Sequence, residues 1–292
     1  MGQSAPRISG FFDATTSTLS YLIADPATGA AAIVDPVLDY EGKAARTSTA
    51  SADRLIEACA GLKVDWILET HTHADHISAA PYAKSKVGGR IAIGAHVAEV
   101  QRTWKRLLNL DPGFRADGSQ FDQLFAEGDR FKIGALDVEV LHTPGHTPAC
   151  ITYVVSAPGS PACAFVGDTL FMPDYGTARA DFPGGDARQL YRSIRRILSL
   201  PPETRVFVCH DYQPGGRAMA YETTVAEQLR ANLHVKDGTT EDAFVEFRTK
   251  RDRTLDMPAL LLPSVQVNIR AGRLPAAESN GIAYLKIPLN HF

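Results

Sequence analysis

Four side chains that commonly bind metals stand within six positions, in the hexapeptide His-Thr-His-Ala-Asp-His at residues 71–76. The apolar run 66–68 precedes the hexapeptide, so we expect a strand that leads into it. Alternate side chains of an extended segment point to the same side, which directs the first two histidines to one point. Asp75 and His76 face an adjacent point if they open the helix that we expect at about 75–87. Imidazoles beside a carboxylate suit zinc, iron or manganese, so the hexapeptide predicts a metal-binding loop.

Three further candidate ligands each follow a predicted strand. His142 opens the motif His-Thr-Pro-Gly-His-Thr-Pro, whose proline and glycine force a tight turn that we expect to aim the His142 imidazole inward. Asp168 lies in Val-Gly-Asp-Thr-Leu-Phe, and His210 lies in Val-Cys-His-Asp-Tyr. Loops at strand ends let a rigid sheet place ligands while leaving them open to a substrate. His146, in the same motif as His142, is expected to be a loop residue or a hydrogen-bond partner and not a ligand.

Hydrophobic periodicity and turn residues predict the elements that position these loops. The expected strands cover residues 10–13, 19–24, 31–35, 65–69, 90–93, 130–133, 137–141, 151–155, 162–166 and 205–208. The expected helices cover residues 52–62, 75–87, 96–108, 187–198, 217–232 and 241–251. Two strand-rich halves with helices outside them predict an α/β fold with two mixed sheets flanked by helices, a four-layer αββα sandwich.

One domain over residues 1–292 is expected, with a structured extension from about Met257. Small, polar or Gly/Pro-marked stretches at 40–52 and 109–122 predict surface loops. The basic run 247–253 is expected to form a solvated helix face, with binding of a substrate carboxylate as the alternative.

Composition narrows the classes of partner. Hydrophobic residues make up 45% of the chain, charged residues 22%, and the formal net charge is -3, so the sequence predicts no nucleic-acid partner and no disorder. It contains no stretch of membrane-spanning length and no signal-like start, which favours a cytoplasmic protein. The four cysteines form no CxxC pair and are expected to be reduced thiols. The sequence leaves a homodimer open.

The order of the motifs resembles the metallo-β-lactamase superfamily, and the match spans about residues 10–215. The resemblance implies the αββα fold and two adjacent metal positions. The first position would be surrounded by His71, His73, His142 and Asp168. The second would be surrounded by Asp75, His76, His210 and the shared Asp168.

Two branches of this superfamily keep the whole ligand set and act on glutathione derivatives: glyoxalase II thioester hydrolases with two metals, and persulfide dioxygenases with one iron. Hydrolysis needs a metal-bound hydroxide and a clamp on the carbonyl, which two metals provide. Oxygenation needs a redox metal with open positions, which two histidines and one carboxylate leave on Fe(II).

Residues outside the ligand set are more similar to the dioxygenases. Arg179, Asp181 and Phe182 resemble the Arg-Thr-Asp-Phe segment of that branch, and residues 261–272 resemble its proline-to-Asn-Met-Arg tail. One departure is that residues 175–178 replace the glycine-cysteine-glycine stretch that precedes the arginine in that branch. This departure leaves the identity of the persulfide open.

The dioxygenase resemblance implies that His71, His142 and Asp168 hold one Fe(II) per chain. His73, Asp75, His76 and His210 would then surround these ligands, where they could orient them or fix tautomers, and Asp75 could accept a proton. The implied reaction converts glutathione persulfide, dioxygen and water into glutathione and sulfite. The alternative is a glyoxalase II-like hydrolase with two Zn(II), and a non-catalytic metal-dependent module is the third interpretation.

Two residues are candidates for binding the anionic substrate. Arg179 could pair with a carboxylate through two hydrogen bonds, and Tyr212 could donate its hydroxyl proton. A surface salt bridge for Arg179 and a packed aromatic ring for Tyr212 are the structural alternatives.

Overall fold

The computed structural model describes residues 5–291. Its first sheet is built from hairpins and from crossover connections. Its six strands run in the order β1 (Arg7–Asp13), β2 (Thr18–Ala24), β3 (Ala30–Val34), β6 (Lys63–Leu68), β8 (Arg90–Gly94) and β9 (Gln123–Phe125). The first three pair antiparallel, and β3, β6, β8 and β9 pair in parallel. The parallel strands therefore end at one edge of the sheet, where the hexapeptide follows β6.

The second sheet runs in the order β10 (Arg130–Ile133), β11 (Leu136–His142), β12 (Ile151–Ser156), β13 (Cys163–Phe165), β14 (Arg205–Phe207) and β15 (Glu222–Thr224). Its strands pair antiparallel except β13 with β14, which pair in parallel. Asp168 and His210 follow these two parallel neighbours, which brings the two residues to the same edge. A small third sheet joins β5 (Arg46–Ser48), β4 (Val37–Glu41) and β7 (Ile77–Ser78).

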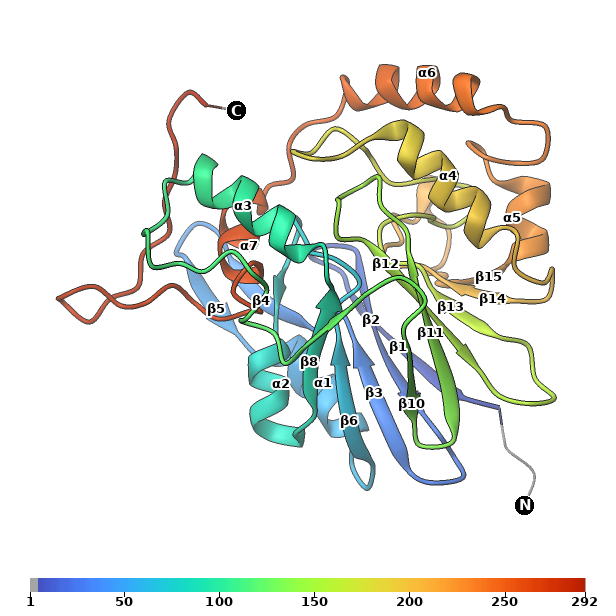
Figure 1. Ribbon diagram of the computed structural model, residues 1–292, viewed down its shortest axis with the longest axis horizontal. Coiled ribbons are helices and arrows are strands. Elements are labelled where there is room, and N and C mark those ends of the chain that lie inside the picture. Colours follow the sequence, from blue (N-terminus) through green and yellow to red (C-terminus); the bar gives the residue numbers. More distant parts are fainter. Residues whose placement is uncertain (1–4, 292) are drawn as a thin grey trace.

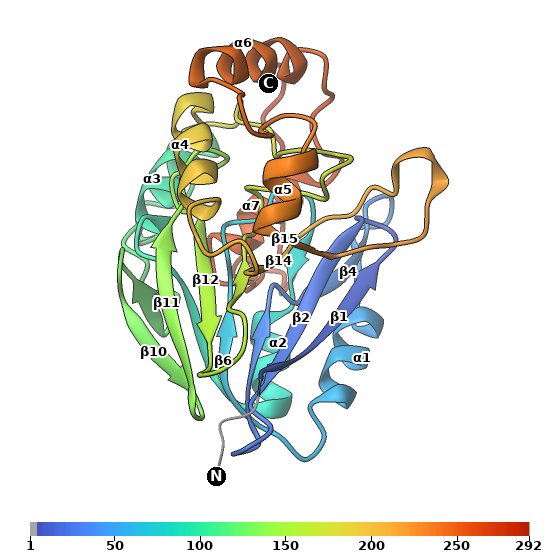
Figure 2. The ribbon, with the colours of Figure 1, turned by 90° about the vertical axis from the view of Figure 1, so that its right-hand side faces the viewer.

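Helices cover the outer face of each sheet (Figures 1 and 2). The first sheet packs against α1 (Ala50–Ala58), α2 (Ala80–Val87), α3 (Val97–Leu107) and α7 (Leu261–Asn268). The second packs against α4 (Ala187–Ile197), α5 (Val225–Ala231) and α6 (Glu241–Asp252). A third buried cluster, which includes Leu19, Tyr153 and Phe165, lies between the sheets. The predicted αββα fold is therefore confirmed.

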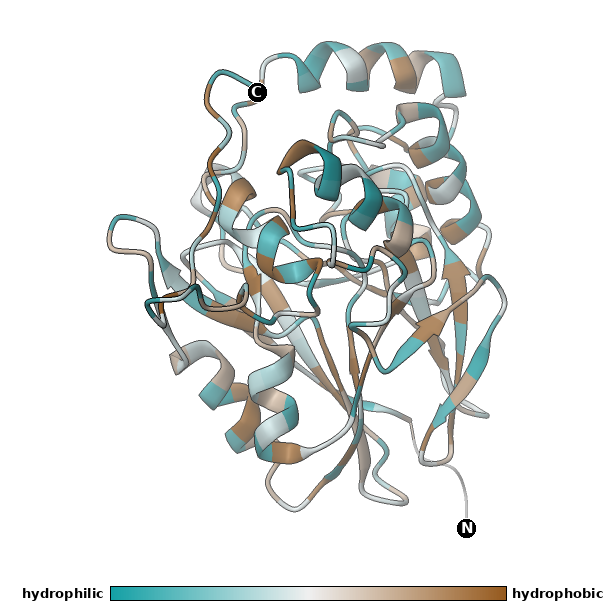
Figure 3. Cartoon of the chain, turned by 60° about the vertical axis from the view of Figure 1, so that its left-hand side comes forward, coloured by the Kyte–Doolittle hydropathy of each residue, from teal (hydrophilic) through white to brown (hydrophobic). Residues whose placement is uncertain are grey.

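Hydrophobic residues gather along the strands, whereas the helices carry many hydrophilic positions (Figure 3). This distribution follows from burying both faces of each sheet in a four-layer sandwich. In the part of the chain that the structure describes, no helix is long and apolar enough to cross a membrane. The four cysteines are free thiols, and all are buried.

Three expected elements differ from the structure. Segment 40–52 is not a loop, because it contains the end of β4, the strand β5 and the start of α1, where Asp39 accepts hydrogen bonds from Ser51. The helix expected from Asp75 begins at Ala80, since β7 pairs with β4 first. The helix expected over 217–232 is helical only from Val225, where the Thr224 side chain caps it; β15 and a short 3-10 turn (Pro214–Gly216) occupy the region before it.

Candidate metal centre

The loop between β6 and α2 carries the hexapeptide, and α7 holds this loop in place. The Asn268 amide donates hydrogen bonds to the backbone oxygens of His73 (2.9 Å) and His76 (2.8 Å). Its oxygen accepts a hydrogen bond from the Ser78 backbone nitrogen at 2.8 Å. Both ends of this amide are therefore used to fix the loop, so the segment beyond Met257 contributes directly to the site.

One group of potential ligands consists of His71, His146 and Asp168, whose metal-binding atoms lie within 4.8 Å of one another. Asp168 Oδ2 lies 3.6 Å from His146 Nε2 and 4.0 Å from His71 Nε2. His146 Nδ1 donates to the Arg179 backbone oxygen (2.9 Å). His71 Nδ1 donates to Thr70 Oγ1 (3.0 Å), whose own proton goes to Asp35. Each ring is thereby fixed with the lone pair of Nε2 free toward Asp168.

His142 lies outside this group, which corrects the expectation that it is the third histidine ligand. Its Nε2 donates to the Pro148 backbone oxygen (2.9 Å), and its ring stacks on His96 with 4.2 Å between centroids. The tight turn after His142 aims His146 inward instead. Gly145 makes this possible: its φ is +138°, and a Cβ there would lie 2.3 Å from the Leu190 backbone.

A second group lies on the other side of Asp168. His210 Nε2 is 3.2 Å from Asp168 Oδ1 and 3.4 Å from Asp75 Oδ2, and His76 Nδ1 is 3.3 Å from the same Asp75 oxygen. His210 Nδ1 lies 3.2 Å from the Ser17 backbone oxygen, to which it donates. Asp168 therefore stands between the two groups, as a carboxylate shared by two metal positions would.

The two ring nitrogens of His73 have different surroundings, and the sequence did not predict the two carboxylates that contact its Nε2. Its Nε2 lies 3.0 Å from Asp35 Oδ1 and 3.1 Å from Glu69 Oε2, and all three residues are buried. Asp35 also accepts hydrogen bonds from the Thr70 backbone nitrogen and hydroxyl, at 2.7 and 2.8 Å. The sequence signal that could have identified Asp35 is its place directly after the apolar strand β3 and before Pro36. The His73 Nδ1 is left free toward Asp75 and His76, with which it forms a further group.

Five buried atoms of these residues have no hydrogen-bond partner among residues 5–291. They are His71 Nε2, His73 Nδ1, His76 Nε2, His210 Nε2 and Asp168 Oδ1. Buried polar atoms without partners cost roughly 1–3 kcal/mol each, so their gathering at one place needs a binding partner to explain it. Histidine nitrogens and a carboxylate oxygen that face one another as acceptors are the donor set of a divalent metal. The residues present therefore fit a metal.

The electrostatics of the centre also favour a cation. Burial lowers the pKa of His210, but Asp168 and Asp75 outweigh burial and raise it to about 9. Burial opposes ionisation of Asp75, yet His210 and His76 hold the pKa of that carboxyl well below its usual range. Carboxylates that stabilise a proton on the imidazole stabilise a metal cation in the same way, and the metal competes with that proton.

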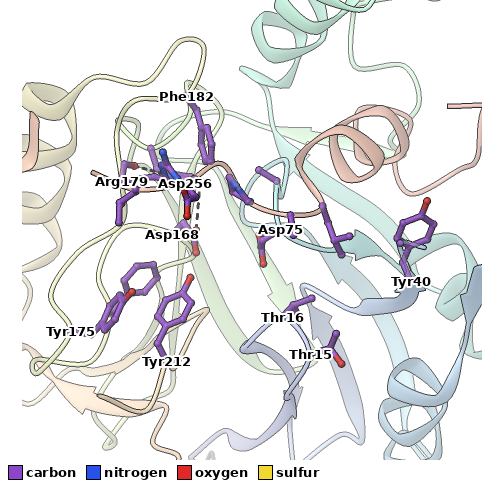
Figure 4. Close-up of a pocket in the computed structure, with 18 of the residues that line it drawn as sticks. Thr15, Thr16, Tyr40, Asp75, Asp168, Tyr175, Arg179, Phe182, Tyr212 and Asp256 are labelled. Carbon is purple, nitrogen blue, oxygen red and sulfur yellow. Dashed lines mark hydrogen bonds and ion pairs between the residues drawn. The ribbon is translucent and has the colours of Figure 1, made fainter. Parts of the chain in front are cut away.

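A pocket of about 780 Å³ opens above the two groups. Figure 4 shows Asp168 and Asp75 near its centre, with Tyr175 and Tyr212 on one side and Arg179 beside Asp256 on another. His146 also lines it. The pocket is large enough for a small-molecule ligand that reaches the cluster.

The family model of the metallo-β-lactamase superfamily matches residues 14–210, a segment that includes every ligand candidate above. The chain belongs to the metallo-β-lactamase superfamily. The resemblance expected from the motifs is thereby confirmed.

Relatives within this superfamily carry names of different activities. A protein of Burkholderia pseudomallei described as a probable metallo-hydrolase is 61% identical over 97% of this chain and 99% of its own length. Glyoxylase B2 of Dictyostelium discoideum is 50% identical over 98% of this chain and 97% of its own length. The persulfide dioxygenase ETHE1 of Bos taurus is 30% identical over 93% of this chain and 91% of its own length. The names of these relatives thus differ: a probable metallo-hydrolase, a glyoxylase and a persulfide dioxygenase.

Some relatives in the superfamily are longer. This chain spans 65% of the length of a beta-lactamase hydrolase-like protein of Agrobacterium fabrum, to which it is 55% identical over 98% of this chain. Among solved structures, ETHE1 from Myxococcus xanthus matches with a TM-score of 0.71 and 29% identity, over 91% of this chain and all of that one. The likeness to this superfamily member therefore covers more of the chain than the segment 14–210 that the family model matches.

The two substrate candidates suggested by the superfamily resemblance both line the pocket. Arg179 is already engaged, since its guanidinium makes two hydrogen bonds to Asp181 (2.6 and 2.8 Å) and one to the Asp256 backbone oxygen (2.7 Å). The Tyr212 ring stacks on Tyr175 with 4.5 Å between centroids. Tyr212 is therefore stacked on one face but 42% exposed, at the side of the pocket that borders the metal cluster.

Proposed function

We propose that this protein is a non-haem iron dioxygenase that oxidises glutathione persulfide, or another low-molecular-weight persulfide, to sulfite. The observation that carries the proposal is the buried His71, His146 and Asp168 group beneath the pocket. Two neutral histidine nitrogens and one carboxylate are the ligand set of oxygen-using ferrous enzymes, because they leave positions free for substrate and dioxygen. The group replaces the one expected from sequence by exchanging His142 for His146.

A bound ferrous ion would supply the redox chemistry between the persulfide sulfur and dioxygen. The chain's own residues would fix the geometry around it. Thr70 and the Arg179 backbone oxygen hold the two imidazoles in one tautomer, so each presents Nε2 without reorganisation. Phe182 packs edge-on against His146, with 5.1 Å between ring centroids, which restricts rotation of that ring.

The overall reaction needs proton acceptors, because RSSH, O2 and H2O become RSH, SO3²⁻ and two H⁺. Asp75 is placed for this role, since its side chain keeps 23% of its surface exposed and borders the pocket. Thr18 donates a hydrogen bond to Asp75 Oδ2 at 3.2 Å, which orients the carboxylate. Asp75 would therefore pass a proton from the substrate side toward solvent and hold it only transiently, because its pKa lies well below the usual range.

A second candidate function is a glyoxalase II-like hydrolase of glutathione thioesters with two Zn(II). The observation that favours it is the second group, in which His210 lies 3.2 Å from the other oxygen of Asp168 and is linked through Asp75 to His76. The names of the Burkholderia and Dictyostelium relatives favour it as well. The superfamily resemblance assigns His73 to the first metal position, whereas its Nδ1 groups with Asp75 and His76, so in this candidate His73 would serve the second position.

The cellular location, the domain organisation, the oligomeric state and the partners of the protein are also proposals. We place the protein in the cytoplasm because its four buried cysteines are unpaired thiols, which suit a reducing compartment. We further propose that residues 1–292 act as one domain, that a homodimer is compatible with function, and that the partners are the persulfide and dioxygen, with no nucleic acid or membrane.

The deciding experiment measures metal content by plasma emission on anaerobically purified protein, and then oxygen uptake and thioester hydrolysis on the same sample. The dioxygenase proposal predicts one iron per chain, oxygen uptake only after glutathione persulfide is added, and negligible hydrolysis of S-lactoylglutathione. Two zinc ions with hydrolysis and no oxygen uptake would support the second candidate and overturn the first. Asp168→Ala should abolish metal retention and activity in either case, whereas Asp174→Ala, an exposed carboxylate paired with Arg217, should preserve both.

A further inference from the structure

Four cationic residues line the pocket above the metal cluster: Lys43, Arg179, Arg248 and Arg251. Arg179 is engaged by Asp181, as described above. Arg248 is only 1% exposed; it is paired with Asp252 at 2.5 Å and donates to the Thr177 backbone oxygen at 3.2 Å. These two arginines therefore have structural partners, and the buried Arg248 departs from the solvated helix face expected for segment 247–253.

Arg251 differs from both neighbours. It lies in the last turn of α6 and is partly buried in the pocket wall. Its guanidinium makes no hydrogen bond or ion pair with any side chain or backbone group of residues 5–291. A guanidinium that is partly removed from water without a partner has donors ready for a planar anion.

The backbone around Arg251 is fixed, so its position is defined. Asp252, the next residue, accepts a hydrogen bond from the Ala180 backbone nitrogen at 2.9 Å, and Arg248 lies one turn earlier on the same helix. These contacts tie the end of α6 to segment 177–180, which leads to the Arg179 oxygen that holds His146. A series of hydrogen bonds therefore connects the end of α6, which carries Arg251, to the His146 side of the metal cluster.

The remaining pocket surface restricts the class of ligand. Phe171, Tyr175 and Tyr212 offer aromatic contacts, while Asp256 adds a carboxylate to the same pocket. Positive and negative side chains together match a substrate end that carries a carboxylate beside an ammonium, as an amino acid does. A highly charged phosphate ester would instead meet the negative charge of Asp256.

We propose that Arg251 binds the carboxylate of an amino-acid-like end of a small thiol derivative whose sulfur lies at the metal cluster. Only the placement of the sulfur at the metal cluster rests on the proposed function; the binding of a carboxylate by Arg251 does not. Arg251 thus replaces Arg179 as the residue that selects an anionic substrate, and a persulfide without a carboxylate is a poorer substrate.

The binding test uses zinc-loaded protein, which does not consume the probes, and titration calorimetry with S-methylglutathione and its dimethyl ester. Wild-type protein should bind the acid more tightly than the ester. Arg251→Gln should weaken binding of the acid by about tenfold, the magnitude expected for a lost charged hydrogen bond, and leave the ester unchanged. Arg253→Gln is the matched control because Arg253 is exposed, two residues away and outside the pocket lining.

A kinetic test on iron-loaded protein separates this inference from the proposed function. Arg251→Gln should raise KM for glutathione persulfide by about tenfold while kcat stays within about twofold, because the lost contact is equal in ground and transition states. If the wild-type protein discriminates acid from ester in calorimetry but oxidises no persulfide, the subsite stands and the dioxygenase proposal fails. Equal binding of acid and ester, with no effect of Arg251→Gln, would overturn the inference.

Discussion

Whether a histidine becomes a ligand depends on the direction in which the backbone presents its ring. His142 ends β11 and stacks on His96, whereas His146 follows a glycine turn that returns the chain to the cluster. Both belong to one seven-residue motif and have the same chemistry. Their difference is set by the packing of Gly145 against Leu190 of α4, a contact that local sequence does not reveal.

Replacing His146 with alanine should weaken metal binding far more than replacing His142 with alanine. His146→Ala deletes a candidate ligand atom. His142→Ala removes only a ring that is hydrogen-bonded to the Pro148 backbone oxygen outside the cluster. Losing a residue that only supports a ligand lowers affinity roughly 10- to 100-fold, so losing a ligand should cost about 100-fold or more. Competition against a chromophoric chelator measures both affinities. Equal values for the two variants would reject His146 as a metal ligand.

The carboxylates behind His73 should matter although they lie away from the pocket. Asp35→Asn is expected to weaken metal binding roughly 10- to 100-fold, because Asp35 orients His73 directly and His71 through Thr70. Glu69→Gln should act in the same direction through the His73 contact alone. The control is Asp39→Asn, since Asp39 accepts hydrogen bonds from Ser51 in the first turn of α1 and is not one of the potential metal ligands among the described residues. Chelator competition, with the Tm of the metal-free protein as a check on folding, would disprove the claim if Asp35→Asn bound metal like the control.

At the scale of elements, the connection between α5 and α6 supports the loop that carries Thr177 and Arg179. The Thr177 backbone nitrogen donates to His234 Nδ1 at 3.1 Å, so this imidazole must stay neutral to accept the bond. Burial, followed by the positive charges of Arg248 and Arg251, lowers the pKa of His234 to about 4. The neutral ring is therefore part of the folded arrangement on this side of the pocket.

Stability should fall between pH 6.5 and pH 4 through His234. The unfolded chain binds a proton below its ordinary pKa of 6.5, whereas the folded ring resists protonation down to about 4. The stabilisation is thus fully present above pH 6.5 and is lost as pH falls, by about 1 to 2 kcal/mol between pH 7 and 5. Urea unfolding of metal-free wild type and His234→Asn measures the difference. The variant should lose less stability on acidification, and parallel losses would contradict this assignment.

At the scale of the whole molecule, the packing of the layers against one another buries the four cysteine thiols. Cys59 lies in the layer beneath the first sheet, Cys163 between the sheets, and Cys150 and Cys209 near the centre. Burial raises the pKa of Cys59 and Cys163 to about 11 and that of Cys150 to about 12. None is therefore a reactive thiolate at neutral pH.

Native protein should consume almost no Ellman's reagent at pH 8, whereas protein in guanidinium chloride should titrate four thiols. The slow native reaction should follow the global unfolding rate, because exposing these sulfurs requires the sandwich to open. The measurement is the absorbance at several denaturant concentrations. A single fast-reacting thiol in native protein would show that one buried cysteine is reached by local opening.

Much of the fold follows from sequence because its signals are local. Alternating apolar stretches and turn residues predicted ten of the fifteen strands in the described residues and the αββα layers, but not β4, β5, β7, β9 or β15. The hexapeptide predicted a metal loop, since the ligand types lie adjacent in the chain. The sequence was less informative where long-range pairing decides the local structure. Ile77 and Ser78 pair with β4 instead of continuing a helix, and β5 forms only by pairing with β4.

The composition of the metal centre was decided partly by the sequence and partly by tertiary structure. Ligand types and their order along the chain determined that histidines and aspartates would converge at the strand ends. Only the packed structure decided that His146 enters the cluster, that Asp35 and Glu69 stand behind His73, and that Arg251 is left without a partner. The physical reason is that ring direction, burial and charge pairing depend on contacts between residues far apart in sequence, such as Gly145 with Leu190 and Asn268 with the metal loop.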